Sequence, residues 1–258
     1  MDIVAVIPAA GIATRISPLP CSKEILPVGI GQWGENLSRR PKVSIQYLLE
    51  NLRMANITKA YIIIRDNKWD IPAFLGDGKI TGMNIAYLMM GLPYGTPFSI
   101  NQAYPFTGSN LVALGFPDIL IRPQNVYKTL INKLKKEQAE VVLGLFRATN
   151  PQKMDMIEFD KSNNVSRIVI KPKETDLQYT YINAVWTPVF SRYMNEFLIR
   201  KLGDIENATA SELYVGHVLQ AFMKDGNNVA YSIIENGSYI DIGTLDDYSD
   251  AVSKYWPD

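Results

Sequence analysis

A short apolar strand that opens into a loop of small residues is the feature that most constrains this chain. Residues 3–7 form an apolar run, rich in β-branched residues and bounded by Pro8, which predicts a buried strand. The next three residues, Ala9, Ala10 and Gly11, are small enough to let the backbone turn tightly and approach a ligand. The sequence therefore predicts a strand whose carboxyl end leads into a binding loop.

A hydroxyl and two cations follow in the segment after this loop. Thr14 and Arg15 stand at the turn, and Lys23 follows in a stretch that contains several prolines. A polyphosphate is bound by backbone N–H donors together with positive charges, and this segment offers both. An ordinary strand and turn with two surface cations would contain the same residues, so both interpretations stay open at this point.

Two known glycine-rich fingerprints do not fit the loop. The P-loop requires Gly-Lys followed by Ser or Thr, where this chain has Ile16 and Ser17. The dinucleotide-binding pattern requires glycine at two positions that hold Ala13 and Ile16, and an acidic residue near a position that holds Gly31. A phosphate loop here would have to be of another kind.

Composition narrows the class of protein. The 258 residues, 47% of them hydrophobic, suffice for one large α/β domain or two small ones with a substantial core. The 26 basic and 26 acidic residues cancel, which argues against a nucleic-acid partner held by bulk charge. The single histidine, His217, makes Ser-His-Asp catalysis a poor expectation, and no metal-ligand spacing surrounds it.

Cysteine usage and hydropathy predict the compartment. The single cysteine, Cys21, excludes an intrachain disulfide and a four-cysteine zinc site, and is typical of a reducing compartment. No stretch approaches the roughly 18–20 apolar residues of a membrane span, and the N-terminus lacks the positive region of a signal peptide. We therefore expect a cytoplasmic protein without a membrane partner.

Apolar runs predict strands that alternate with helices in the first part of the chain. Continuous apolar runs of this kind suit parallel strands buried on both faces. Residues 29–41 are polar and rich in glycine, which predicts a loop long enough to be a functional flap. The expected strands are 3–7, 60–64, 84–90, 111–116 and 140–146, and the expected helices 42–55, 69–75, 97–103 and 125–138.

The pattern changes from residue 154 onward. Residues 156–170 alternate like an antiparallel hairpin added to the parallel core. A capping box at 209–212, which includes Glu212, predicts the start of a helix that runs to about 225, and Thr244 with Asp247 predicts the start of the last helix. Further strands are expected at 179–186 and 229–234, and a further helix at 189–201.

The loop after the first strand resembles the G-x-G-T-R-x-x-P…P-K signature of sugar-1-phosphate nucleotidyltransferases, of the glucose-1-phosphate thymidylyltransferase and uridylyltransferase type. This chain reads Gly11-Ile12-Ala13-Thr14-Arg15-Ile16-Ser17-Pro18, then Ser22-Lys23 and Leu26-Pro27-Val28. It differs from the signature at Ala13, where the family has its second glycine, and at Ser22, where the family has proline.

A second segment resembles the family's loop around the nucleotide base. Pro93, Gly95 and Thr96 match its P-x-G-T pattern, while Met90 stands where the family usually has the glutamine that reads the base. From the residues alone, Thr96 is expected to cap a helix that has Pro97 at its first position. The two interpretations are compatible.

Three segments further along resemble the family's metal and acceptor motifs. Asp118, just past a predicted strand, stands where the family has a Mg²⁺-binding aspartate, although a lone aspartate there is more often a turn or cap residue. Lys171 matches the Glu-Lys-Pro lysine, with Ile170 in place of the glutamate, and Met154-Asp155 replaces a Tyr-Gly pair. Asp241 lies in a segment that matches W-x-D-x-G-T in its Asp, Gly and Thr, with Tyr in place of Trp.

The resemblance covers residues 3–250 and implies a fold and a reaction. The fold class is α/β: a Rossmann-like mixed, mostly parallel sheet flanked by helices, with an antiparallel hairpin extension in the second half, as a single nucleotidyltransferase domain over 1–258. The reaction is the formation of an NDP-sugar and pyrophosphate from an NTP and a sugar 1-phosphate. A phosphate oxygen is the nucleophile and is already ionised near neutral pH, so no general base is needed.

The resemblance also implies roles for individual residues. Arg15 would bind the leaving pyrophosphate, Lys23 the α-phosphate or the pyrophosphate, and Lys171 the sugar phosphate. Asp118 and Asp241 would share one Mg²⁺. The residues that would line the nucleotide are Ala9, Ala10, Gly11, Thr14, Pro93, Gly95 and Thr96.

Two alternatives remain open from the sequence. The altered residues at 154, 155 and 170 would also suit a non-catalytic nucleotide or nucleotide-sugar sensor on the same fold. The missing glutamate at 170 would suit a transferase whose acceptor is a phosphate other than a hexose phosphate. The resemblance also implies that a homo-oligomer is common in the family, without locating an interface.

Overall fold

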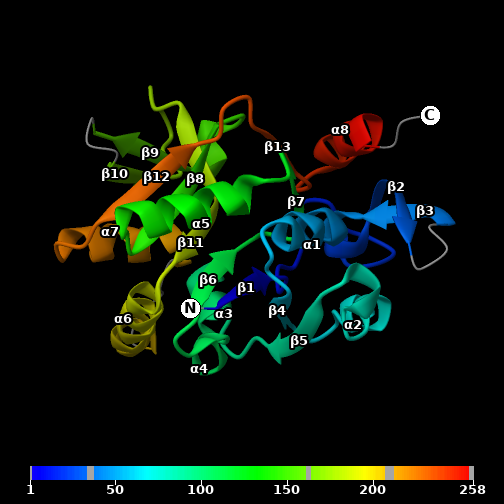
Figure 1. Cartoon of the computed structure of the whole chain (residues 1–258), viewed down its shortest axis with the longest axis horizontal. Coiled ribbons are helices and arrows are strands. Elements are labelled where there is room, and N and C mark those ends of the chain that lie inside the picture. Colours follow the sequence, from blue (N-terminus) through cyan, green and yellow to red (C-terminus); the bar gives the residue numbers. More distant parts are fainter. Residues whose placement is uncertain (1, 34–37, 161–163, 207–211, 256–258) are drawn as a thin grey trace.

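A nine-stranded mixed sheet organises the chain, whose computed structural model describes residues 2–33, 38–160, 164–206 and 212–255 (Figure 1). At one end of the sheet four strands run parallel in the order β6-β1-β4-β5. They are β1 (Ile3–Pro8), β4 (Lys59–Ile64), β5 (Asn84–Met89) and β6 (Leu111–Leu114). These are four of the five strands predicted for the first part of the chain.

The rest of the sheet is mixed. β11 (Tyr179–Trp186) runs antiparallel to β6, β8 and β9, and β12 (Val229–Ile233) runs parallel to β8 (Val141–Arg147). The predicted hairpin is confirmed as β9 (Asp155–Phe159) with β10 (Val165–Ile170). The expected fold class, a mixed sheet with a parallel core and antiparallel strands added in the second half, is therefore confirmed.

Side chains alternate between the two faces of β1, and each face packs on its own set of helices. Ala5 and Ile7 lie in one core with apolar residues of α1 (Ser44–Met54), α2 (Asp70–Leu75) and α5 (Val126–Glu137). Val4 and Val6 lie in the other core with α3 (Thr96–Asn101), α6 (Pro188–Glu206) and α7 (Val215–Lys224). Burial on both faces is why these strands are continuous apolar runs.

A third, smaller core lies beside the main sheet. It joins the N-terminal segment to α8 (Leu245–Tyr255), with Leu26, Val28, Ile242 and Tyr255 among its buried members. Figure 1 shows α8 next to β2 (Pro27–Trp33) and β3 (Ser38–Val43), on the side of the molecule away from α6 and α7. This core fixes the segment after the N-terminal loop to the C-terminal end of the chain.

Two features were not expected from the sequence. Residues 29–33 and 38–41, predicted as part of a loop, belong to β2 and β3, in which Gly31 pairs with Arg40, so the loop prediction is wrong for them. β7 (Ile119–Arg122) and β13 (Ser238–Asp241) form a separate antiparallel pair in which Asp241 lies opposite Ile119. A four-residue strand is too short for its periodicity to be recognised.

The first residues of the helices were predicted less accurately than the existence of the helices. α3 begins at Thr96 with Gly95 as its N-cap, so the expectation that Thr96 caps the helix is wrong by one residue. α7 begins at Val215, and the predicted capping box falls largely at 207–211, outside the described residues. For the last helix the prediction is confirmed, because the Asp247 N–H donates to Thr244 Oγ1 at 3.3 Å. The remaining short helices are α4 (Tyr104–Thr107), η1 (Lys23–Ile25), η2 (Lys79–Thr81) and η3 (Pro151–Lys153).

Helix length and hydropathy were also compared with the requirements of a membrane span. Within the described ranges, no helix combines the length and the apolar character needed to cross a membrane.

Gly144→Ala should destabilise the fold by about 1–3 kcal/mol, the usual cost of overpacking a core. Gly144 on β8 lies opposite Asn183 on β11, and a Cβ at this glycine would lie 2.0 Å from Asn183 Oδ1. The matched control is Gly203→Ala on α6, whose new Cβ would meet no atom within 4 Å. Urea unfolding of the two variants measures the difference, and equal midpoints would contradict this account of the β8–β11 packing.

Candidate active site

A cleft made of three adjoining hollows lies beyond the carboxyl ends of the parallel strands. Their volumes are about 680, 500 and 280 Å³. The 500 Å³ hollow is lined by residues at or within two positions of the ends of all four parallel strands, namely Pro8, Arg65, Met90 and Phe116. This is the position where open α/β sheets bind ligands.

The N-terminal loop contributes one wall of the cleft. Ala10, Gly11 and Thr14 line the 500 Å³ hollow, and Thr14 and Arg15 line the 680 Å³ hollow. Ala9 does not face the cleft, because its side chain is fully buried in the core and its N–H donates to Ile63 O at 2.8 Å. The proposed contact of Ala9 with the nucleotide is therefore not supported by its position.

Ala13 keeps a backbone conformation that glycine adopts more easily. Its φ is +59°, in the left-handed region that a Cβ disfavours by roughly 1–2 kcal/mol. The Ser17 hydroxyl and N–H both donate to Ala13 O, at 2.9 and 3.1 Å, and so support the turn. Alanine is therefore accommodated in the left-handed conformation of this turn, and Thr14 and Arg15 face the cleft.

Lys23 and Asp118 form an ion pair at the centre of the cleft. Lys23 opens η1 and its Nζ contacts Asp118 Oδ2, with 14% and 15% of the two side chains exposed. Burial opposes the charged form of Lys23, but the carboxylates of Asp118, Glu24 and Asp241 together outweigh burial and raise the pKa of the lysine. Lys23 therefore remains charged in the structure.

Asp241 lies beside Asp118 because β13 pairs with β7. The Ile242 N–H donates to Asp118 O at 2.9 Å, which joins the ends of the two strands. Burial and then the like charge of Asp118 raise the pKa of Asp241 to about 6, against an ordinary value of 3.8, while Lys23 and Arg15 act in the opposite direction. Two carboxylates far apart in the sequence are thus held so close that Asp118 disfavours the ionised form of Asp241.

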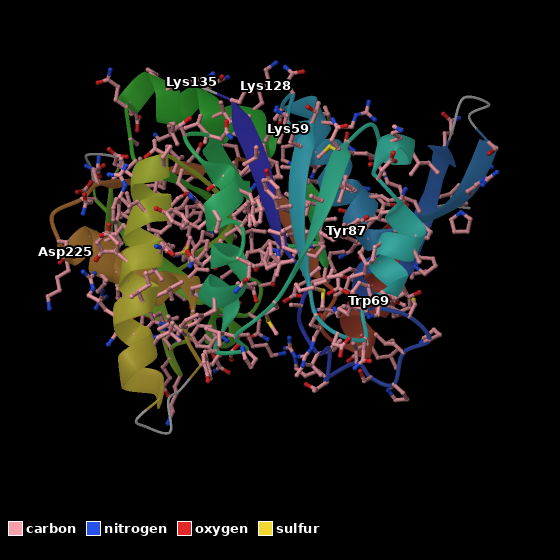
Figure 2. All side chains as sticks on the ribbon, turned by 90° about the horizontal axis from the view of Figure 1, so that it is seen from below. Lys59, Trp69, Tyr87, Lys128, Lys135 and Asp225 are labelled. Atoms are coloured by element: carbon pink, nitrogen blue, oxygen red, sulfur yellow. The ribbon has the colours of Figure 1, made fainter. Side chains whose placement is uncertain are left out.

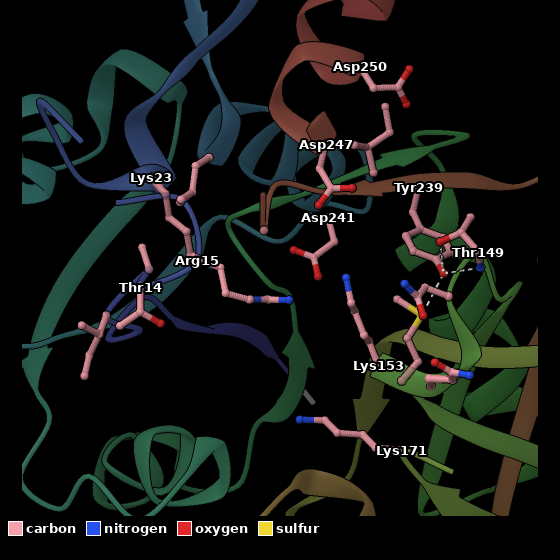
Figure 3. A pocket seen from close by; sticks show the side chains of 18 of the residues that line it. Thr14, Arg15, Lys23, Thr149, Lys153, Lys171, Tyr239, Asp241, Asp247 and Asp250 are labelled. Carbon is pink, nitrogen blue, oxygen red and sulfur yellow. Dashed lines mark hydrogen bonds between the residues drawn. The ribbon is translucent and has the colours of Figure 1, made fainter. Parts of the chain in front are cut away.

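Arg15 approaches the same carboxylates from the N-terminal loop. A Cβ at Gly243 would lie 3.0 Å from Arg15 Nη2 and 3.6 Å from Asp241 Oδ1, so the absence of a side chain leaves room for the guanidinium. Figure 3 shows Arg15 and Lys23 entering from one side of Asp241, and Lys153 and Lys171 from the other. Cations from distant parts of the chain thus converge on the carboxylate pair.

The carboxylate pair fits a divalent cation of the Mg²⁺ type. Among the described residues no group of three or more His, Cys, Asp or Glu side chains could hold a metal. Mg²⁺ is usually bound by one or two carboxylates, with waters and substrate phosphates completing its coordination. Asp118 and Asp241 therefore suit a cation that arrives with a phosphate ligand.

Pro93, Gly95 and Thr96, which the resemblance assigns to the nucleotide, line the 500 Å³ hollow. Gly95 has a φ of +124°, and a Cβ there would lie 2.0 Å from Leu213 O, so this glycine is required for the close approach of two loops. Met90, in place of the family's glutamine, lines the same hollow and its sulfur accepts from Ser99 Oγ at 3.2 Å.

Lys171 enters the cleft from the end of the β9–β10 hairpin. The backbone φ of Lys171 is +40°, which is unusual for a residue other than glycine. Its Nζ lies 3.6 Å from the centre of the Tyr214 ring. Lys153, which was not predicted from the sequence, lines the 680 and 280 Å³ hollows together with Lys171. Nothing in the local sequence pattern of Lys153 distinguishes it from a surface lysine.

His217 has a structural role, as expected. Its Nδ1 accepts a hydrogen bond from the Tyr214 N–H at 3.0 Å, at the start of α7. Glu212 does not cap this helix; it lines all three hollows, and its carboxylate accepts from the Tyr214 hydroxyl at 3.0 Å. The expectation that Glu212 acts as a capping residue is therefore wrong.

Two polar contacts that the sequence did not reveal hold Lys23 in place. The Ser22 N–H and hydroxyl both donate to the Asp70 carboxylate, at 2.6 and 2.7 Å. On the other side of Lys23, the buried Glu24 carboxylate accepts from Lys68 Nζ at 2.5 Å. Lys23 thus lies between two anchored neighbours.

Comparison with known proteins identifies the class. Residues 4–256 match the family described as nucleotidyl transferase, so the chain belongs to that family. This confirms the resemblance seen in the N-terminal loop. The cations and carboxylates described above are therefore the candidate active site of a nucleotidyltransferase.

Curated relatives specify the class further. A low-salt glycan biosynthesis nucleotidyltransferase of Haloferax volcanii is 23% identical over 94% of this chain, which spans 63% of that relative's length. A glucose-1-phosphate thymidylyltransferase of Neisseria gonorrhoeae is 24% identical over 96% of this chain and 81% of its own length. The chain is thus similar over nearly its whole length to proteins of this type.

Solved structures agree on the fold. A UTP-bound UGPase from Acinetobacter baumannii superposes with a TM-score of 0.76 at 18% identity, over 99% of this chain and 93% of the other. A UDP-glucose pyrophosphorylase in complex with UDP-glucose also gives a TM-score of 0.76 at 18% identity, over 99% and 98%. At this identity the likeness concerns the fold alone.

Asp70→Ala should lower kcat/KM for nucleotidyl transfer roughly 10- to 100-fold, because it leaves the Ser22 N–H without its acceptor and loosens Lys23. The double variant Ser22→Pro/Asp70→Ala should recover most of this loss. Ser22 has a φ of −57° and a ψ of 136°, which proline can adopt, and proline has no N–H to satisfy. Pyrophosphate release measures both variants, and a double variant no better than Asp70→Ala would contradict the anchoring role.

Asp241→Asn should raise the unfolding temperature relative to the wild type, by more at neutral pH than near ~pH 4, in protein treated with a chelator. Folding raises the pKa of Asp241 to about 6. The folded state therefore binds more protons than the unfolded state up to that pH, and the contribution of Asp241 to stability falls as the pH rises through this window. Asparagine cannot ionise and removes that loss.

Thermal unfolding across the same pH range measures the difference between the two proteins. Asp246→Asn, which changes an exposed carboxylate in the first turn of α8, is the matched control. A difference between Asp241→Asn and wild type that does not change with pH would contradict the prediction.

Proposed function

We propose that this chain transfers a nucleotidyl group from an NTP to a sugar 1-phosphate and releases pyrophosphate. The observation that carries the proposal is the convergence of cations from opposite sides of one carboxylate pair. Arg15 and Lys23 face Asp241 from the N-terminal loop, and Lys171 lines the same hollow from the end of the hairpin (Figure 3). Two phosphate groups that meet at one cation-lined site are what this reaction requires.

The reaction needs no general base. An oxygen of the acceptor phosphate, ionised near neutral pH, attacks the α-phosphorus of the NTP, and the bond between the α-phosphorus and the bridging oxygen breaks. The electron pair of that bond leaves with pyrophosphate, whose charge Arg15 and Lys23 are positioned to neutralise. Lys171 would hold the acceptor phosphate, so catalysis consists of positioning and charge neutralisation.

Asp118 and Asp241 would hold Mg²⁺, which supplies further charge neutralisation at the phosphates when it is bound. The raised pKa of Asp241 supports this role, since a cation would favour the ionised form of a carboxylate that burial and Asp118 disfavour. Lys23 contacts Asp118 in the structure, so its ammonium group would lie beside the phosphates that the cation binds.

The 500 Å³ hollow would hold the nucleoside. Gly11, Pro93 and Thr96 line it, together with Met90 and Arg65. The names of the relatives support thymidine or uridine nucleotides and a glucose 1-phosphate type of acceptor. Because Met90 has no amide to pair with a base edge, we do not assign one base.

The whole of residues 1–258 would act as one nucleotidyltransferase domain, and we expect it to work in the cytoplasm. The family match over residues 4–256 and the single cysteine support these two expectations. A homo-oligomer is compatible with this reaction but is not required by it.

Lys23→Ala and Asp241→Asn should each lower turnover roughly 10²- to 10³-fold, the usual effect of removing one preorganised charge from a transition state. Lys135→Ala is the matched control, because Lys135 lies on the exposed side of α5 (Figure 2). The assay follows pyrophosphate release with each common NTP and a panel of sugar 1-phosphates. Unchanged release in both variants would refute the assignment, and wild-type binding of NTP without any product would favour a sensor instead.

A further inference from the structure

The Lys171 ammonium lies against an aromatic ring and has no carboxylate partner. Its Nζ lies 3.6 Å from the centre of the Tyr214 ring. Among the described residues no Asp or Glu oxygen lies within 4 Å of this Nζ, whereas Lys23 at the centre of the cleft is paired with Asp118. Lys171 and Tyr214 both line the 280 Å³ hollow, so the contact between them lies in the wall of the cleft.

Two carboxylates that line the same hollow are engaged by other donors. Asp155 accepts hydrogen bonds from the Tyr181 hydroxyl, at 3.1 Å, and from the backbone of Gly216. Glu212 accepts from the Tyr214 hydroxyl at 3.0 Å. Neither carboxylate forms an ion pair with the lysine, so among the described residues the ring is the group that holds the ammonium in place.

Contacts on several sides fix the Tyr214 ring itself. Its backbone N–H donates to His217 Nδ1 at 3.0 Å, and the two rings stack with their centres 5.7 Å apart and 16° between their planes. Its hydroxyl is held by Glu212. The preceding residue, Leu213, pairs with Gly95, which lines the 500 Å³ hollow. The ring therefore has a fixed place between the nucleoside side of the cleft and the lysine.

A ring and a carboxylate hold a lysine in different ways. The negative face of an aromatic ring attracts an ammonium group without carrying a net charge. A carboxylate would neutralise the lysine and would compete with phosphate oxygens for its three N–H donors. A lysine held by a ring is thus ordered in advance while its charge stays available to an anion.

We propose that Tyr214 is a positioning residue for Lys171, and that its ring face holds the ammonium ready for the phosphate group of the acceptor. This inference rests on the proposed function, in which Lys171 binds that phosphate. Tyr214 acts through the lysine and does not itself contact the phosphate. A side chain ordered before binding loses less rotamer freedom when the ligand arrives, so the ring improves the affinity for the acceptor more than the rate of the chemical step.

Steady-state kinetics on Tyr214→Leu and Tyr214→Phe test the inference. Leucine removes the ring and should raise the KM for glucose 1-phosphate about 3- to 30-fold, the range of a cation–π contact, while kcat and the KM for NTP stay within about twofold. Phenylalanine keeps the ring and should restore the KM to within about twofold of the wild type. In a Lys171→Met background, Tyr214→Leu should cause no further change, because the group through which it acts is gone.

Tyr179→Leu is the matched control. The Tyr179 ring also lies near a cation, with its centre 5.5 Å from Arg147 Cζ, but Tyr179 is not among the residues that line the three hollows. Its variant should leave the KM for glucose 1-phosphate unchanged.

Nuclear magnetic resonance tests the contact without nucleotide or acceptor. In protein that contains isotope-labelled lysine, the ε-methylene protons of Lys171 should be shifted upfield by the ring current of Tyr214, and Lys171→Arg assigns the signal by removing it. Tyr214→Phe should keep the upfield shift, and Tyr214→Leu should abolish it.

The inference is overturned if the wild type shows no upfield-shifted lysine, or if Tyr214→Leu has its full effect without Lys171. Equal KM values for the phenylalanine and leucine variants would also overturn it, because the hydroxyl and Glu212 would then carry the effect. Failure of the proposed function is distinguishable: if calorimetry shows binding of glucose 1-phosphate but no pyrophosphate is released, the dissociation constants replace the KM values and the same ratios apply. An upfield signal in a wild type that binds neither glucose 1-phosphate nor inorganic phosphate would make the contact purely structural.

Discussion

The active site depends on the enforced proximity of two carboxylates. Pairing of β7 with β13 brings Asp118 and Asp241 together, and their partial burial weakens the screening of their repulsion by water. Lys23 contacts Asp118, and Arg15 acts on Asp241 from the N-terminal loop. The N-terminal loop and the β7–β13 strand pair are therefore linked by the charges of these four side chains.

The position of Lys23 illustrates how these charges are held in place. A lysine side chain is long and loses considerable rotamer entropy when it is fixed, so its backbone must be held firmly. Hydrogen bonds from Ser22 to Asp70 and the Glu24–Lys68 pair hold the residues on either side. Both anchors come from the segment after β4, so the parallel core of the sheet positions the catalytic loop through side chains and not through the loop's own stiffness.

Strands with a periodic hydropathy pattern and residues within a recognisable motif could be predicted from the sequence. Buried strands such as β1 and β4 were recognisable as apolar runs, and Arg15 and Asp241 were recognisable from their neighbours. The β7–β13 pair was missed because two short strands far apart in the sequence leave no periodic pattern, although this pair brings the carboxylates together. Lys153 was missed for a related reason, since its place in the cleft follows only from the tertiary arrangement.

At the two positions where the N-terminal loop differs from the family signature, the backbone is supported by different physical means. Ala13 adopts the left-handed turn at a cost of about 1–2 kcal/mol, and two hydrogen bonds from Ser17 to its carbonyl oxygen support that turn. Ser22 replaces the stiffness of a proline ring with two hydrogen bonds to Asp70. Both changes lie on the phosphate side of the cleft, where the required geometry is the same for every NTP.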